Sequence, residues 1–442
     1  MSIKAQGGPE AGDAQNRPKY GLGGFVLLLA LSWLTAIDVL GFLHIGSITG
    51  SGLFTVGTFV TLVFLAIPAL LIAGIHGSES QLHRGVTRSR SRAPSGILLA
   101  FLAYVWLRIL LDPSPEGIQN GLVYGSFILA IFCGWAFAEQ DVIASTQRWA
   151  PWLATLTAAV FLIGVIAGTP IFGERSYALV AILYVAMMVP NRSGGLIVKL
   201  GLALVVVATA VSLSRTALFV VLAELSLLVV RSQKRRVLRW LGSMMLVGAA
   251  TASLLTYYAP LKERFLGGDQ GLALGSIAIN TSGRSNIWST VWKSSLEAPV
   301  FGHGAGTASK LVEETFVTIS HPHNDYLRLF HDFGLVGLGA FLLGYIVILV
   351  RLIRHARRSD GWVTWSAAVA LGACGLAMWT DNVLVYSFVM VPLGFLVGIA
   401  LGDERGPREQ RGPSRKRRST FSRPMLQGSP TRECQASLGR LT

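Results

Sequence analysis

The chain has 442 residues, of which 52% are hydrophobic and only 14% are charged. Because soluble globular domains carry about 25% charged residues, this composition excludes an ordinary water-soluble fold. The net charge of +15 is concentrated in a few segments, which argues against a nucleic-acid-binding surface. The three cysteines lack the spacing of metal sites or disulfide frameworks, so we assign them no function.

Long apolar runs divide the chain into predicted membrane spans. A span needs about 20 apolar residues, and in lipid each backbone polar group must be bonded within its own helix. We therefore predict an all-α, polytopic membrane protein with about twelve spans, eleven to thirteen being the range. The predicted spans are 22–43, 52–74, 96–111, 120–138, 151–168, 177–190, 195–213, 214–230, 240–258, 335–352, 361–379 and 383–401.

Lys and Arg in short loops predict the orientation of these spans, because such loops are usually cytoplasmic. In the predicted orientation the acidic loop 112–119 lies on the extracytoplasmic side of the membrane, and so does the long loop 259–334. We expect a multi-pass protein of the bacterial inner (plasma) membrane with both termini in the cytoplasm. The cytoplasmic segments are the N-terminal segment 1–20, the basic loops 75–95, 231–239 and 351–360, and the disordered basic tail 402–442.

The one long loop, 259–334, separates the first nine predicted helices (21–258) from the last three (335–401). It holds four of the eight histidines in the chain. Apolar residues at helical spacing predict an amphipathic helix over 285–296, lying on the membrane or on the helix bundle. Loops this long in compact proteins are usually functional or disordered, and this one is not of low complexity, so we expect it to be the catalytic region.

The segment from His321 to Gly337, HPHNDYLRLFHDFGLVG, is the strongest candidate for chemistry. Asn324 or Asp325 suits a helix N-cap and Gly334 suits a helix stop, so we predict a helix of about two turns over 326–333. His323 then lies at the start of that helix, where a neutral imidazole can take a proton from an attacking hydroxyl. His321 competes for the role because it lies only two residues away.

Other polar groups in the outer region have less specific interpretations. The glycine-rich turn Gly302–Gly306 is similar to a phosphate cradle but lacks a following Lys-Ser/Thr. His303 within this turn is interpreted as a solvated loop residue, the alternative being that it lines the site. Asp381 and Asn382 form a predicted buried pair that could bind sugar hydroxyls or cap helices. A metal site is not expected, because alternating ligands at 321, 323 and 325 require an extended chain where a helix begins.

Three motifs together resemble the bacterial O-antigen ligase and polysaccharide polymerase family. The first is His323-Asn324, nine residues, Gly334, two residues and Gly337. The second is the stretch from Ser282 to Pro299 followed by the glycine-rich turn, and the third is SLSR, Ser212–Arg215. The resemblance covers about 212–337, whereas the first 190 residues match only in being hydrophobic spans.

Members of this family transfer a glycan from a polyprenyl (undecaprenyl) diphosphate carrier to a hydroxyl acceptor outside the cytoplasm. The resemblance implies that Arg215 and Arg284 hold the diphosphate, since guanidinium groups bind phosphate in two-point fashion. It implies that His323 is the base or orients the acceptor, with Asn324 and His321 also contacting substrate. The implied reaction is inverting and uses no metal or cofactor.

Two questions stay open at the level of sequence. The acceptor can be the lipid A core, as for a ligase, or a growing polysaccharide, as for a polymerase. The alternative class is a transporter of a small solute or lipid-linked glycan, and Glu224, near the middle of a predicted span, is the residue that favours it. A peptidoglycan-type polymerase is a further rival, which would place an essential acid in the large loop. Arg215 and Arg284 could also be ordinary interfacial or surface charges.

Overall fold

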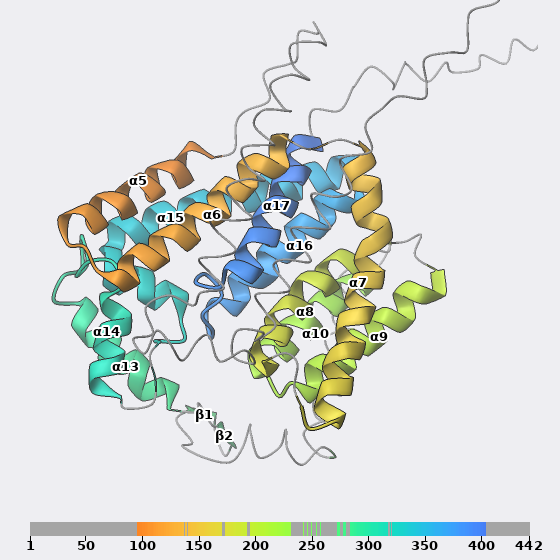
Figure 1. Ribbon diagram of the computed structural model, residues 1–442, viewed down its shortest axis with the longest axis horizontal. Helices are drawn as coiled ribbons and strands as arrows, with labels where there is room; N and C mark the ends of the chain where they lie inside the picture. The colour runs from red at the N-terminus through yellow and green to blue at the C-terminus, as the bar shows by residue number, and fades with distance from the viewer. Residues whose placement is uncertain are drawn as a thin grey trace, which may run out of the picture. The chain divides into compact units, whose positions relative to one another are not determined.

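The computed structural model describes residues 95–136, 138, 140–169, 173–191, 195–230, 283–316, 319 and 321–403, a few single positions between 242 and 257, and two strands (Figure 1). The predicted spans 22–43 and 52–74 lie outside the described residues, as does nearly all of 240–258. The described helices are α5 (Gly96–Leu111), α6 (Pro115–Ala136), α7 (Gln140–Ile166), α8 (Glu174–Met188), α9 (Gly195–Val211), α10 (Arg215–Val230), α13 (Arg284–Ser295), α14 (Thr307–Thr315), α15 (Asp325–Ser359), α16 (Trp362–Ala377) and α17 (Ser387–Asp403).

The helical prediction is confirmed for the described part of the chain, where each of the remaining nine predicted spans coincides with a helix. By length and composition α6, α7 and α15 can each cross a bilayer, and α5, α9, α16 and α17 are shorter apolar helices. Twelve spans in total stays a prediction. The all-α class is confirmed for the described residues, which also include one short antiparallel pair within the long loop, β1 (Leu272–Leu274) and β2 (Ile277–Ile279).

Helix α7 begins earlier than the sequence suggested, at Gln140 rather than at Pro151. The predicted span begins at 151 because the apolar run begins there, after a segment that contains Asp141 and Arg148. The helix instead continues through Pro151, whose carbonyl oxygen accepts a hydrogen bond from the Thr155 hydroxyl at 2.7 Å. An interior proline removes one backbone bond without necessarily ending a helix whose neighbours hold it in place.

Glycines let α6 and α17 pack with their backbones in contact. A Cβ added at Gly134 would lie 2.1 Å from the Phe395 carbonyl oxygen, and one added at Gly398 would lie 2.1 Å from that of Ile131. Close approach through small residues is a main source of helix association in lipid, where apolar burial alone supplies little. This contact fixes α17, and with it the segment that joins α16 to α17.

Helix α15 contains the predicted break at Gly334, which has φ +64° and ψ −166°. A Cβ there would lie 2.3 Å from the Val300 carbonyl oxygen, so only glycine fits. The amides of Leu335 and Val336, freed by the break, donate to the carbonyls of Pro299 and Val300 at 2.9 and 3.2 Å. The short helix and the following span are thus two parts of one kinked helix.

The predicted outer loops share one end of the bundle. The Arg108 guanidinium donates to the Gly302 carbonyl at 3.0 Å, and the Ser114 hydroxyl donates to that of Ala305 at 2.7 Å. The turn between α5 and α6 therefore lies against the loop that precedes α14. At the opposite end, the Trp362 indole N–H donates to the Met187 carbonyl at 2.9 Å. This pairing agrees with the predicted loop order, and the side of the membrane stays a prediction.

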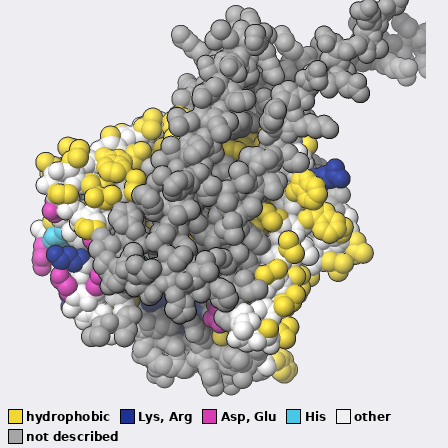
Figure 2. Space-filling model, viewed as in Figure 1, with side chains coloured by type: hydrophobic (Ala, Val, Ile, Leu, Met, Phe, Trp, Pro, Cys, Tyr) yellow, Lys and Arg dark blue, Asp and Glu magenta, His cyan; other side chains and the backbone are white. Residues whose placement is uncertain are grey.

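Hydrophobic and charged side chains lie over different helices on the face shown in Figure 2. Hydrophobic side chains cover the surface over α5, α7 and α9, whereas charged side chains gather over α14. Exposed apolar residues on these helices include Leu110, Trp152, Leu156, Ile166 and Leu200. Such large exposed apolar surfaces are typical of helices that face lipid.

Candidate active site

Helix α13, predicted over 285–296, is confirmed as an amphipathic helix that packs on the bundle. Its apolar face contributes Ile287 and Val291 to a small buried cluster with Val312 of α14 and Leu327 and Phe330 of α15. Leu327 and Phe330 therefore lie on the face of α15 that packs against α13 and α14. This cluster seats the N-terminal part of α15, and with it the residues immediately before that helix.

The glycine-rich turn before α14 is already occupied by a carboxylate of the chain itself. Asp332 is fully buried and accepts hydrogen bonds from the amides of Gly306 and Ala308 at 3.0 and 2.8 Å and from the Thr307 hydroxyl at 3.2 Å. Amides at a helix start bind anions readily, and here an internal anion fills the position. The turn therefore has the hydrogen-bond donors of a phosphate cradle, but they bind the Asp332 carboxylate of the same chain instead of a phosphate.

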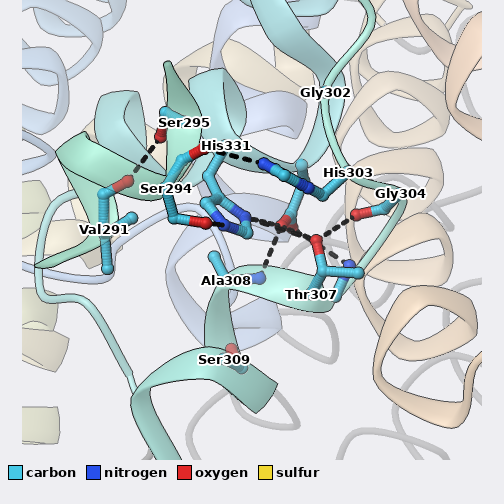
Figure 3. A network of polar contacts seen from close by, with 12 residues as sticks. Val291, Ser294, Ser295, Gly302, His303, Gly304, Thr307, Ala308, Ser309 and His331 are labelled. Atoms are coloured by element: carbon cyan, nitrogen blue, oxygen red, sulfur yellow. Dashed lines mark hydrogen bonds and ion pairs between the residues drawn. The ribbon is translucent and has the colours of Figure 1, made fainter. Parts of the chain in front are cut away.

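His303 is not the solvated loop residue that its position suggested (Figure 3). Its ring stacks on that of His331 with centroids 4.6 Å apart, and its Nε2 lies 2.8 Å from the Ser294 carbonyl oxygen. Nε2 of His331 lies 3.2 Å from the Ser294 hydroxyl, and its Nδ1 lies 3.3 Å from that of Thr307. The network ties the end of α13 to the start of α14 and to α15.

His323 immediately precedes α15 and is held in an unusual backbone conformation. Its φ of +54° lies in the left-handed region, which non-glycine residues seldom adopt. Asn324 is the N-cap of α15, as predicted, and its side chain accepts a bond from the Leu327 amide at 3.0 Å. On the other side, the Trp288 indole donates to the Pro322 carbonyl at 2.9 Å. Contacts on both sides thus fix the histidine.

Nδ1 of His323 contacts two groups from distant parts of the chain. Nη2 of Arg175, at the start of α8, lies 2.7 Å away, and Nδ2 of Asn382 lies 3.0 Å away. Arg175 also forms an ion pair with Asp381, whose carboxylate accepts from its Nε at 2.9 Å. Asp381 and Asn382 are buried as predicted, but they hold Arg175 and His323 rather than capping a helix.

Arg284 and Arg215 begin two further helices that reach the same segment. Arg284 is the first residue of α13, and its guanidinium donates to the Thr380 carbonyl. Arg215 is the first residue of α10, and the Thr216 hydroxyl beside it bonds to the Thr380 hydroxyl at 2.7 Å. The Ser-x-Ser-Arg motif has a local explanation, because the Ser214 side chain accepts from the Ala217 amide and caps α10.

The segment Thr380–Asn382, between α16 and α17, is thus the meeting point of four helix N-termini. The helices α8, α10, α13 and α15 all begin there, and each N-terminus carries a partial positive charge. They bring together Arg175, Arg215 and Arg284, all partly exposed, against the single buried carboxylate of Asp381 in this segment. The region is therefore electropositive and suited to an anion.

Burial and neighbouring cations keep His323 neutral. Burial is the largest cause and the guanidinium groups of Arg175, Arg284 and Arg328 add to it, which together lower the pKa of His323 from 6.5 to about 3. At neutral pH the ring is therefore uncharged. A neutral imidazole can act as a hydrogen-bond donor through one nitrogen and as an acceptor through the other.

We expect the free energy of unfolding to decrease as the pH falls from 6.5 towards 3. In that window an unfolded His323 binds a proton and the native one does not, so acid favours the unfolded state. Thermal unfolding in detergent should be compared for wild type and His323→Gln between pH 7 and about pH 4. The wild type should lose more stability than the variant; parallel curves would show that His323 titrates normally.

The other predicted residues point elsewhere. Nδ1 of His321 lies 3.4 Å from the Ser309 hydroxyl of α14, away from the contacts of His323. Asp325 accepts from the Leu384 amide at 2.7 Å, and Asn324 is engaged as the N-cap. Of the three positions considered as metal ligands, 321 thus bonds to α14, whereas 323 and 325 both bond to the segment between α16 and α17.

Arg175 is the residue that the sequence analysis missed. The sequence did contain a signal for it. Arg175 lies in the predicted loop 169–176, which is on the extracytoplasmic side in the predicted topology, and short loops on that side contain few arginines. An arginine that breaks this rule at the end of a span is a candidate for a specific ion pair or an anion site. Arg215 breaks the rule in the same way, and it was noticed only because it belongs to a motif.

Apolar helices with lipid-type surfaces, carrying a buried polar cluster at one end, define an integral membrane protein. Residues 200–342 match the family described as O-antigen ligase, and this match supports a relationship to the O-antigen ligase family. The match supports a glycan-transferring membrane enzyme of the ligase and polymerase type. No curated protein matches the chain. Arg215, Arg284 and His323 lie inside the matched range, whereas Arg175 and Asp381 lie outside it.

Proposed function

We propose that the protein transfers a glycan from a polyprenyl diphosphate carrier to a hydroxyl acceptor, at the membrane end where Arg215, Arg284 and His323 converge on Thr380–Asn382. The observation that supports this most is the convergence itself. Three sequence motifs separated by up to about a hundred residues supply these side chains, and hydrogen bonds join their neighbourhoods. The catalytic region is the extracytoplasmic loop 259–334 together with the ends of the adjoining spans.

The donor's diphosphate is an anion that needs cations as it departs. Arg215 and Arg284 supply permanent charge, because a guanidinium keeps its proton and offers several N–H donors. The N-termini of α10 and α13 add to the field from the same positions. Fixed positive groups that face developing negative charge are a large contribution to catalysis, since they need no reorganisation during reaction. No metal ion or cofactor is required by this arrangement.

His323 lies within this field and serves the acceptor hydroxyl, as its base or by orienting it. The transfer inverts the anomeric centre when the acceptor attacks from the face opposite the diphosphate. The acceptor is either the lipid A core, as in a ligase, or the end of another carrier-linked chain, as in a polymerase. A polymerase must hold two diphosphate-linked lipids, whereas a ligase holds one.

The direct test is a transfer assay with a polyprenyl diphosphate oligosaccharide as donor, given lipid A core or a second carrier-linked glycan as acceptor. Arg215→Ala, Arg284→Ala and His323→Ala should each reduce transfer by about 10²-fold or more. Lys293→Ala, an exposed position on α13, is the matched control and should transfer at the wild-type rate. Unchanged transfer by all three alanine variants contradicts the proposal, and the acceptor that supports transfer separates ligase from polymerase.

One observation supports the alternative that the protein is a transporter. Glu224 of α10 is 2% exposed, and among the described residues neither of its carboxylate oxygens has a hydrogen-bond partner. Ionisable groups within spans often belong to transport pathways. Glu224→Gln should leave transfer unchanged if the enzyme proposal holds. Loss of glycan movement across vesicles without loss of transfer in detergent would favour transport.

A further inference from the structure

The neighbours of His323 determine which ring nitrogen carries its proton. Nδ1 lies 2.7 Å from Nη2 of Arg175, and a guanidinium can only donate. An Nδ1 that receives this bond must present its lone pair. The contact is held by Asp381, which is 2% exposed and forms its ion pair with the same Nη2 of Arg175.

The second contact gives the same answer independently. An asparagine side chain can present either its oxygen or its nitrogen, and the two are distinguished by their partners. Asn382 accepts at Oδ1 from Nη2 of Arg328 at 3.3 Å, and Arg328 is again only a donor. The amide orientation is therefore fixed, and Nδ2 of Asn382 is the atom that faces Nδ1 of His323 at 3.0 Å.

Two donors at Nδ1 leave the proton of the neutral ring on Nε2. The ring stays neutral at physiological pH because burial and three nearby guanidinium groups oppose a further charge. Within the described part of the chain no hydrogen bond reaches Nε2. The N–H at Nε2 is therefore the group that His323 has to offer to another molecule.

We infer that His323 acts as a hydrogen-bond donor through Nε2–H rather than as a proton acceptor, and that Arg175 and Asn382 are positioning residues that impose this role. The inference rests on the proposed glycan transfer and refines it. The atom that receives the bond is a substrate oxygen. A base at this position would need a lone pair on Nε2, which this tautomer lacks.

The reaction still has to dispose of the acceptor's proton. The acceptor oxygen forms a bond to the anomeric carbon, and the bond from that carbon to the diphosphate oxygen breaks. The electron pair of the broken bond stays on the diphosphate, and the hydroxyl proton passes to a water molecule on the acceptor side, because the diphosphate leaves from the opposite face of the anomeric carbon. No chain residue has to change its protonation state. Protein charges that face His323 stay constant in this scheme, and they are Arg175 of α8, Arg284 of α13, Arg328 of α15 and Asp381 before α17.

Substitutions at 323 separate a donor from a base. Glutamine carries an amide N–H near the position of Nε2 but cannot take up a proton at neutral pH, whereas asparagine is too short to reach it. We expect His323→Gln to keep roughly a tenth of wild-type transfer and His323→Asn and His323→Ala to lose about 10²-fold or more. Size-exclusion profiles in detergent should be the same for all three. A glutamine variant as inactive as alanine overturns the donor role.

A spectroscopic measurement tests the positioning residues without relying on activity. In the full-length protein with 15N-labelled histidine, long-range proton–nitrogen spectra distinguish the two neutral tautomers, and His323→Gln assigns the signal. We expect wild-type His323 to be in the Nε2–H form and Arg175→Met to lose this preference. An Nδ1–H ring in the wild type overturns the inference. Normal transfer by the alanine variants at 215, 284 and 323 instead rejects the proposed function, so the two failures are distinguishable.

Discussion

Replacing Asp381 by alanine is expected to reduce glycan transfer by about 10²-fold, because it releases Arg175 from its ion pair and His323 from its position. The Asp381 carboxylate also accepts from the Asn382 amide at 2.7 Å, so both neighbours of Nδ1 are affected. Removing one partner of a fully buried pair costs roughly 3–5 kcal/mol. The Arg175 side chain is 35% exposed, so we expect a smaller loss of stability, about 2 kcal/mol.

A double substitution separates stability from activity at this pair. Arg175→Met combined with Asp381→Leu removes both charges, and we expect it to recover most of the thermal stability lost in Asp381→Ala. It should not recover transfer, because Arg175, the nearer of the two donors to Nδ1 of His323, is absent. Glu174→Ala changes an exposed acid next to Arg175 and serves as the matched control, with stability and transfer unchanged. Wild-type transfer by the double variant would show that the pair has no role in the reaction.

Replacing Asp332 by alanine is expected to cost about 3 kcal/mol of stability, the largest effect outside the proposed site. The substitution leaves the amides of Gly306 and Ala308 without the carboxylate that they bind, in a buried part of the structure. It also removes an acceptor for the Thr307 hydroxyl. Unfolding temperature in detergent and the yield of monodisperse protein measure the effect.

Two variants make the Asp332 result specific. Asp332→Asn keeps one acceptor oxygen and should lie between wild type and alanine. Lys310→Ala breaks only an exposed pair with Glu314 on α14, and should change stability by less than about 0.5 kcal/mol. If Asp332→Ala were as stable as Lys310→Ala, the glycine-rich turn would not depend on its internal anion. That turn would then be available to an external one.

The sequence by itself determined the helical, membrane-embedded character of the protein and the local signals around its motifs. Span positions followed from apolar runs because a bilayer sets a minimum length for them. The cap at Asn324 and the break at Gly334 followed from properties of single residues, an acceptor side chain and tolerance of positive φ. These features depend on neighbours within a few positions, so they can be read from the chain alone.

The family motifs likewise named Arg215, Arg284 and His323 from the sequence, but not the surroundings that give them a role. The start of α7 was placed too late, because an apolar run marks where a span begins and not where its helix begins. His303 was misread because its stacking partner His331 lies 28 positions further along the chain. That contact leaves no trace in the local sequence.

Only the tertiary structure decided what surrounds the imidazole of His323. Arg175 and Asn382 lie 148 and 59 residues from it in sequence, and no short-range pattern connects them. Their approach depends on where α8 and the segment before α17 are held by the bundle, including the glycine contacts between α6 and α17. Hydrogen-bond roles are set by the atoms that meet, so the tautomer of a histidine becomes definable only once the fold has brought its partners together.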